Sequence, residues 1–204
     1  LFKLFKSDEL NDIPNNDRNI FYKTLLDNQG HVDPVDINPT EDVALFQYTG
    51  GTTGVPKAAQ LTHANLTANV EQVAAWLPDA RPGVDKMLGV LPFFHVFAMT
   101  IVMNLSVKMG FEIIATPRFD LEDTLKIIDK KKPQFFPAVP AIYSAINNHK
   151  KRDQYDLTSL RTCVSGGAPL PVEVKKSFEE KTGCIVVEGY GLSETSPVLC
   201  VNPI

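Results

Sequence analysis

The chain has 204 residues, of which 44% are hydrophobic and 22% are charged, and its formal net charge is −4. This composition is typical of a packed globular protein and excludes wholesale disorder. The slightly acidic balance lacks the broad basic field of a nucleic-acid binder, so no nucleic-acid partner is expected. The length is sufficient for a core that needs no disulfide or metal for stability.

The cysteine pattern indicates a reducing, cytoplasmic compartment. Cys163, Cys184 and Cys200 include no C-x-x-C pair, which favours reduced thiols. No signal peptide is visible, and the longest apolar run, residues 96–107, is shorter than the roughly 20 residues that span a bilayer. The chain begins without methionine and stops directly after a motif, from which we expect a piece of a longer protein.

Residues 1–40 are rich in Asn, Asp and Pro and are predicted to form an extended lead-in segment. Residues 1–6 alternate Leu and Phe with Lys, which fits either a frayed end or a helix on a membrane surface. Residues 21–26 predict one or two helical turns. The remainder, residues 41–204, is interpreted as one central ATP-binding α/β region, for reasons that follow.

From residue 43 onward, short apolar runs alternate with helical periodicity. The predicted strands are residues 43–48, 57–61, 87–91, 111–115, 134–138, 161–165 and 185–188, the first of them buried and the last ending the sheet. Helices are predicted after the caps Thr62 and Asp120, near residues 96–108, over residues 140–148, and between Pro171 and Gly183. This alternation predicts an α/β fold with a mostly parallel sheet flanked by helices, in which ligands bind beyond the carboxyl ends of the strands.

Residues 49–57 read Thr-Gly-Gly-Thr-Thr-Gly-Val-Pro-Lys. Three glycines let backbone N–H groups approach an anion closely, and the threonine hydroxyls and the lysine add polar and charged contacts. The loop is not a Walker A motif, because proline precedes the lysine and alanine follows it. A polar hairpin without function is the alternative, but a polyphosphate site explains more of these residues.

Residues 48–57, followed by Leu61-Thr62-His63, resemble the phosphate-loop signature of the adenylate-forming superfamily. That superfamily includes acyl-CoA synthetases, firefly-luciferase-like enzymes and peptide-synthetase adenylation domains. Residues 92–97 look like its aromatic-histidine segment, and residues 165–169 and 188–195 look like its adenine-site segments. The resemblance covers roughly residues 40–204 and implies the central part of the large N-terminal domain.

Two details narrow the resemblance to one group within the superfamily. Amino-acid-activating members carry an aspartate in the aromatic segment, whereas this chain has no acid between Asp85 and Glu112. Gly50 stands where many members have serine or threonine, as in bacterial long-chain fatty acid–CoA ligases. The implied reaction joins a fatty acid to coenzyme A at the expense of ATP, with Mg²⁺ as cofactor. An aryl- or short-chain acyl-CoA synthetase and a non-catalytic nucleotide-binding module are the alternatives.

The resemblance also implies roles for individual residues. The phosphates of ATP would be held by Thr49, Gly50, Gly51, Thr52, Thr53, Gly54 and Lys57. The adenine site and α-phosphate would be contacted by Gly167, Ala168, Glu188, Gly189, Tyr190, Gly191 and Ser193. Thr49 and Glu194 would bind Mg²⁺. The catalytic residues would be His95, Lys57 and Glu194, although a histidine beside aromatic residues often only satisfies a backbone group.

A fatty acyl chain needs a dry groove, for which the candidates are Val96, Phe97, Ala98, Met99, Ile101, Val102, Met103, Phe135, Val139 and Val164. Ordinary core packing is the alternative for each of them. The residues present include no Tyr-x-x-Gly-Asp segment for the ribose hydroxyls, and no late catalytic lysine. The resemblance places these, with the hinge and the C-terminal lid domain, beyond Ile204. Acyl-chain length, oligomeric state and contact with a membrane surface are left open.

Overall fold

The computed structural model describes residues 14, 16, 18–27, 30, 33–49 and 56–204. The chain divides into two units, residues 1–37 and residues 38–204. The first unit contains the short helix α2 (Tyr22–Leu26), as residues 21–26 predict, and none of its residues is buried. Residues 1–6, where a membrane-surface helix was one interpretation, lie outside the described residues.

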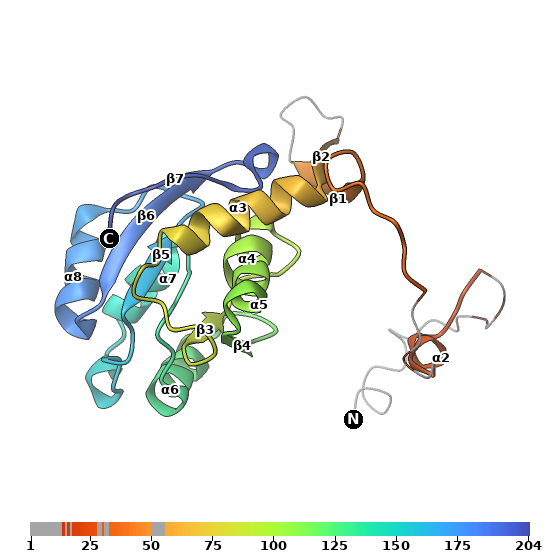
Figure 1. Ribbon diagram of the computed structural model, residues 1–204. Helices are drawn as coiled ribbons and strands as arrows, with labels where there is room; N and C mark the ends of the chain where they lie inside the picture. Colours follow the sequence, from red (N-terminus) through yellow and green to blue (C-terminus); the bar gives the residue numbers. More distant parts are fainter. Residues whose placement is uncertain (1–13, 15, 17, 28–29, 31–32, 50–55) are drawn as a thin grey trace. The chain divides into compact units, whose positions relative to one another are not determined.

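The second unit is built around a parallel sheet, which confirms the expected fold class. Its strands are β3 (Lys86–Gly89), β4 (Glu112–Ala115), β5 (Thr162–Ser165) and β6 (Ile185–Gly191), shown in Figure 1. β3 pairs with β4 and β5 pairs with β6, both in parallel. Between β3 and β5 lies the extended segment 134–138, which bridges both neighbours in parallel through Phe135.

Segment 134–138 forms isolated bridges rather than the continuous strand that its apolar residues predict. Main-chain hydrogen bonds still join it to the strand on either side, from Leu88 N–H to the Phe135 carbonyl (2.9 Å) and from Ala138 N–H to the Val164 carbonyl (3.0 Å). Pro137 has no N–H to donate, so the ladder is interrupted inside the segment. The segment therefore completes the sheet with fewer hydrogen bonds than a regular strand.

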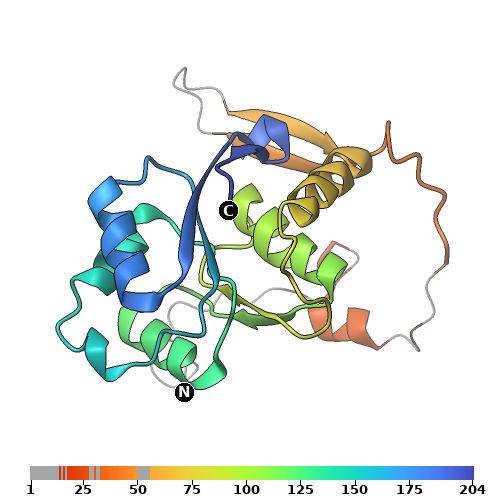
Figure 2. The same ribbon diagram turned by 60° about the vertical axis from the view of Figure 1, so that its left-hand side comes forward.

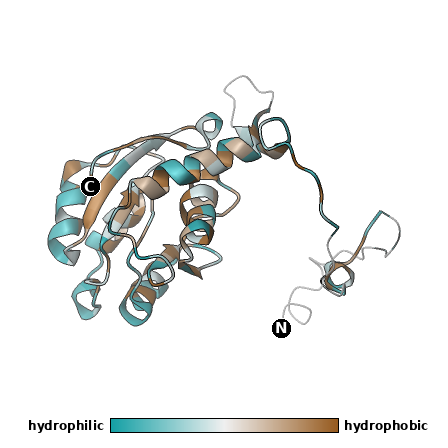
Figure 3. Ribbon diagram, in the orientation of Figure 1, coloured by the Kyte–Doolittle hydropathy of each residue, from teal (hydrophilic) through white to brown (hydrophobic). Residues whose placement is uncertain are grey.

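Helices cover both faces of the sheet, as Figure 2 shows. On one face, Leu88 and Phe136 pack with the buried sides of α6 (Leu121–Lys131), α7 (Pro140–Asn147) and α8 (Val172–Thr182). On the other face, Met87 and Phe135 pack with α3 (His63–Ala75) and with the helical residues 96–109. Adjacent residues thus enter opposite cores because side chains alternate across a strand. Figure 3 shows the apolar colour of β6 beside the more polar surface of α8.

The predicted helix boundaries are largely confirmed. The Thr62 hydroxyl accepts the Asn65 N–H at the start of α3, and the Asp120 carboxylate accepts the Asp123 N–H at the start of α6. Pro140 lies in the first turn of α7, and Gly183 ends α8 at a φ of 74°. These ends are determined by local capping chemistry, which the sequence contains directly.

Three expectations are wrong in detail. β1 (Val43–Thr49) is not a buried strand of the main sheet, because it pairs only with β2 (Lys57–Thr62) in an antiparallel hairpin and its residues are exposed or half-buried. β6 does not end the sheet, since β7 (Val198–Val201) returns antiparallel to it. The helix near residues 96–108 consists of α4 (Val96–Ala98), the π-helix η2 (Met99–Asn104) and α5 (Leu105–Met109).

Two 3-10 turns complete the described elements, η3 (Arg152–Gln154) and η4 (Ser193–Thr195). Within the described part of the chain, no helix has the length and apolar character needed to cross a membrane.

Candidate functional site

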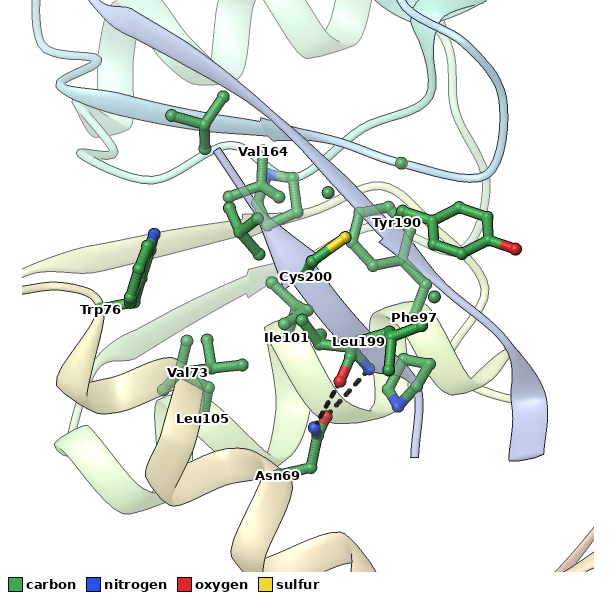
Figure 4. Close-up of a pocket in the computed structure, with 18 of the residues that line it drawn as sticks. Asn69, Val73, Trp76, Phe97, Ile101, Leu105, Val164, Tyr190, Leu199 and Cys200 are labelled. Atoms are coloured by element: carbon green, nitrogen blue, oxygen red, sulfur yellow. Dashed lines mark hydrogen bonds between the residues drawn. The ribbon is translucent and has the colours of Figure 1, made fainter. Parts of the chain in front are cut away.

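A cavity of about 620 Å³ lies between the sheet face that carries Phe135 and the helices α3 and η2. Side chains from one face of the sheet, such as Thr162 and Val164 on β5, form its floor. β7 borders it on another side. Figure 4 places Tyr190 and Trp76 at opposite ends, with Ile101 and Cys200 between them. The cavity is therefore elongated and bordered largely by apolar side chains.

Six of the residues expected at the nucleotide site line this cavity: His95, Gly167, Gly189, Tyr190, Gly191 and Ser193. They come from the end of β6, from the turn after it, from the loop after β5 and from the start of α4. Segments separated by about a hundred residues along the chain thus meet at one end of the sheet, as the parallel topology predicts.

Two of the glycines are required by the backbone geometry. Gly167 has a φ of +81°, a conformation that side chains disfavour, where the chain turns out of β5. At Gly191 a Cβ atom would lie 2.0 Å from the Pro197 carbonyl oxygen, so a side chain cannot fit without moving the turn. Both glycines therefore shape the rim of the cavity.

His95 caps α4 and borders the cavity at the same time. Its Nδ1 accepts the N–H of Phe97 at 3.2 Å. Because Nδ1 is the acceptor, the neutral ring carries its proton on Nε2, which is then available as a donor. The histidine does satisfy a backbone group, but the group is an N–H rather than a carbonyl, and its exposed ring also lines the cavity.

The turn that carries Glu194 lies next to the hairpin formed by β1 and β2, since β2 packs against η4. Glu194 and Lys57 are exposed, and Thr49 is half-buried at the end of β1. The Thr49 hydroxyl donates to the Lys57 carbonyl across the hairpin at 3.4 Å, which leaves its oxygen lone pairs free. Gly50, Gly51, Thr52, Thr53 and Gly54 lie outside the described residues.

Glu188 does not line the cavity, but it holds two segments beside it. Its carboxylate accepts the Leu170 N–H at 2.7 Å, which ties down the loop that holds Gly167 and Ala168. Its carbonyl accepts the Asn202 N–H at 3.0 Å and so joins β6 to the end of β7. Ala168 is exposed and does not line the cavity.

The expected acyl groove is only partly assembled. Val96, Phe97, Ile101, Phe135 and Val164 line the cavity, whereas Ala98 and Val102 are buried in the core beside it. Met99, Met103 and Val139 do not border it. Part of the remaining wall comes from residues on α3 and β7 that the sequence patterns did not indicate: Asn69, Val73, Trp76, Leu199 and Cys200.

Among the described residues, no group of three or more His, Cys, Asp or Glu side chains could hold a metal ion on its own. A magnesium ion that bridges phosphates needs fewer protein ligands, because the phosphates and water supply the others. The oxygens of Thr49 and Glu194 are of the kind that Mg²⁺ prefers, and the hairpin and η4 bring their segments together.

Comparison with known proteins gives consistent matches. The AMP-binding enzyme family matches residues 5–204. A long-chain-fatty-acid–CoA ligase of Bacillus subtilis is 55% identical over 166 residues, which are 81% of this chain and 30% of that protein. The chain therefore spans about 30% of the length of that curated relative.

Solved structures agree with the fold. The N-terminal domain of FACL13 from Mycobacterium tuberculosis matches with a TM-score of 0.72 and 32% identity, over 80% of this chain and 40% of that one. ATP-bound MatB from Rhodopseudomonas palustris matches with a TM-score of 0.72 and 28% identity, over 83% and 32%. These matches confirm the resemblance drawn from the four sequence segments, and the chain belongs to the AMP-binding enzyme family.

Proposed function

We propose that the protein to which this chain belongs is an ATP-dependent long-chain fatty acid–CoA ligase. The observation that carries the proposal is the cavity itself, in which His95, Tyr190 and Ser193 border the same space as an apolar wall. A nucleotide and a fatty acyl chain need these two kinds of surface in contact. The 55% identity to a bacterial ligase of this name supports the same substrate class.

The reaction has two steps. In the first, a fatty-acid carboxylate oxygen attacks the α-phosphorus of ATP, and pyrophosphate leaves, giving an acyl-adenylate. In the second, the coenzyme A thiolate attacks the acyl carbon, and AMP leaves with the electron pair of the broken C–O bond. The protein contributes mainly by positioning and by neutralising charge, since phosphoryl transfer offers little covalent chemistry to side chains.

At one end of the cavity, the exposed ring of Tyr190 would stack on the adenine, because an aromatic face accepts a base without requiring hydrogen bonds. Gly167, at its positive φ, leaves room for the purine beside it. The His95 Nε2–H would donate to the substrate carboxylate or to an α-phosphate oxygen. Ser193, which also lines the cavity, would reach the α-phosphate.

The outer phosphates would be bound by the loop between β1 and β2, with Lys57 as the counter-charge at its end. Thr49 and Glu194 would hold Mg²⁺, whose charge would stabilise the phosphate oxygens when it is bound. The fatty acyl chain would lie along Ile101, Phe135 and Val164. Burial of each methylene there contributes about 0.8 kcal/mol, which favours long chains over short ones.

The experiment is to incubate the full-length protein with ATP, Mg²⁺ and coenzyme A and to follow pyrophosphate release with a panel of acids. We expect release with palmitate, slower release with octanoate, and little with acetate or 4-coumarate. Faster turnover of acetate or 4-coumarate would support an aryl- or short-chain synthetase instead. Binding of ATP without acid-dependent pyrophosphate release would indicate a nucleotide-binding module without catalysis.

A further inference from the structure

Asn69 is a buried polar residue on the cavity side of α3, with only 4% of its surface exposed. Its side-chain Nδ2 donates to the Val198 carbonyl at 2.8 Å, and its Oδ1 accepts the Val198 N–H at 3.0 Å (Figure 4). One side-chain amide thus satisfies both main-chain groups of one residue of β7. β7 is the edge strand of its sheet, so Asn69 takes the place of a neighbouring strand at that position.

Val198 is the residue that closes the turn carrying Glu194. It pairs with Gly191 on β6, and the turn between them is held by the Leu192 N–H to the Pro197 carbonyl at 3.1 Å. A Cβ atom added at Gly191 would lie 2.0 Å from the Pro197 carbonyl oxygen, so the two ends of the turn are close together. Holding Val198 therefore holds one end of the turn that carries Glu194.

A second residue holds the same turn from another element. The hydroxyl of Thr100, on the π-helix η2, donates to the Ser196 carbonyl at 3.0 Å, and both residues are buried. Asn69 and Thr100 therefore form hydrogen bonds to the main chain of Val198 and Ser196, which follow η4. We call Asn69 and Thr100 together the clamp.

α3 connects Asn69 to β2, the strand that begins with Lys57. It follows β2 without a gap, and its first turn is capped by Thr62 and Asn65. Two helical turns after Asn69, the indole N–H of Trp76 donates to the Asn202 carbonyl at 3.2 Å. α3 is thus fastened to the β7 segment at two points, and its N-terminus continues the hairpin that carries Lys57.

We propose that Asn69 and Thr100 are positioning residues that hold the turn carrying Glu194 beside β2, and so set the affinity of the site for Mg²⁺ with ATP. Neither side chain is proposed to touch the substrate. The inference rests on the proposed function, in which Glu194 is the metal ligand. Buried side chains of this kind are costly to leave unpaired, so the clamp has a strong preference for one arrangement of the turn.

The test is the Mg²⁺ dependence of ATP binding by the full-length protein, measured by titration calorimetry, and of its ATP–pyrophosphate exchange. Loss of partners that orient a metal ligand typically weakens metal binding about 10- to 100-fold. We therefore expect Asn69→Ala to raise the half-saturating Mg²⁺ concentration about tenfold or more. Thr100 does not line the cavity, and Thr100→Val keeps the side-chain shape. Thr100→Val should shift Mg²⁺ dependence in the same direction while KM for palmitate stays unchanged, and it keeps the test valid even if Asn69→Ala does not fold.

The matched control is Thr67→Ala. Thr67 lies on the same helix, is exposed and does not line the cavity, and its hydroxyl donates to the His63 carbonyl within α3 at 2.8 Å. Its Mg²⁺ curve should superimpose on that of the wild type. In a Glu194→Gln background, Asn69→Ala should add less than about a twofold shift, because two residues that act through one group are not additive.

The outcomes separate the two proposals. Normal Mg²⁺ dependence in Asn69→Ala and Thr100→Val, with a clear shift in Glu194→Gln, overturns the clamp and leaves the proposed function intact. A full additional shift in the Glu194→Gln background also overturns the clamp, since Asn69 would then act elsewhere. No shift in Glu194→Gln overturns the metal role of Glu194, and the clamp with it.

Discussion

Lys57 is an exposed cation at the start of β2, and we propose that the loop before it binds phosphate. In the full-length protein, we expect Lys57→Ala to weaken binding of ATP and pyrophosphate but not of palmitate. A charged hydrogen bond contributes roughly 1.5–3 kcal/mol, which corresponds to a loss of about ten- to a hundredfold in affinity. Titration calorimetry with each ligand separately measures the difference.

Lys176→Ala is the matched control for this prediction. Lys176 is exposed on α8, which packs on the opposite face of the sheet from the cavity. Its replacement should leave both affinities unchanged. Equal losses for ATP and palmitate in Lys57→Ala would contradict the assignment of the loop to phosphate.

The sequence motifs led to Tyr190, His95 and Ser193, and these residues do border one cavity. Each belongs to a short segment whose amino-acid sequence resembles a motif of the family. Asn69 could not be found in this way. Its partner Val198 is 129 positions further along the chain, and nothing in the local pattern of α3 distinguishes a buried amide from a solvated one. Long-range hydrogen bonds of this kind are visible only in the folded structure.

At the level of elements, the start of α3 is set by its cap. The Thr62 hydroxyl accepts the Asn65 N–H at 3.2 Å, and the Asn65 side chain accepts the Thr62 N–H at 3.0 Å. We expect Thr62→Ala to destabilise the 204-residue chain by about 1 kcal/mol, because the Asn65 N–H at the helix end loses its acceptor. Urea unfolding followed by circular dichroism measures the change in free energy.

Thr67→Ala serves as the comparison for the cap. The Thr67 hydroxyl donates to the His63 carbonyl inside the same helix at 2.8 Å, and the residue is exposed. Since alanine has the higher helix propensity, this variant should be neutral or slightly more stable. If both variants lose the same stability, hydroxyl loss rather than capping explains the effect.

Helix ends were predictable, but strand partners were not. The apolar sequence of residues 43–48 is typical of a buried strand. β1 nevertheless pairs only with its hairpin neighbour β2 and stays partly exposed. β7 contains only four residues after a proline-containing turn, which is too short for its alternation to be recognised. Strand pairing depends on contacts between distant segments, whereas capping depends on three or four adjacent residues.

At the scale of the whole molecule, an ion-pair network joins the starts of two strands. The Asp85 carboxylate is buried, accepts the Arg81 N–H at 2.8 Å and pairs with both Arg81 and Arg161. Burial alone would raise the pKa of Asp85, but the hydrogen bonds from Arg81 and the charge of Arg161 outweigh it and lower the pKa below its ordinary value of 3.8. The Arg161 guanidinium also lies over the Phe135 ring, 5.4 Å from its centre.

A lowered pKa in the folded state means that this carboxylate stabilises the fold above its ordinary pKa, and that the contribution is lost as the pH falls through the folded pKa. We expect Asp85→Asn to cost roughly 1.5–3 kcal/mol at pH 7, less than a fully buried pair because both arginines are partly exposed. Below about pH 4 the difference from the wild type should shrink. Urea unfolding of both proteins at pH 7 and pH 3 tests this, and a constant difference would contradict it.

The chain by itself should separate binding from turnover. It contains the cavity and the phosphate-loop hairpin, but it spans 30% of the length of the Bacillus subtilis relative. The resemblance places the ribose-binding acid and a late catalytic lysine outside these residues. Binding energy for a nucleotide is distributed over many contacts, whereas loss of one charged group that stabilises a transition state costs about 10²–10³ in rate.

We therefore expect the 204-residue chain to fold, to bind ATP weakly and to form no detectable acyl-CoA. A missing lid would also leave the cavity open to water, which weakens every electrostatic contact inside it. The measurement is pyrophosphate release from the isolated chain with ATP, Mg²⁺, palmitate and coenzyme A, beside the full-length protein as positive control. Sustained turnover by the isolated chain would show that these residues contain all the groups the chemistry needs, and that neither a distal lysine nor a lid is required.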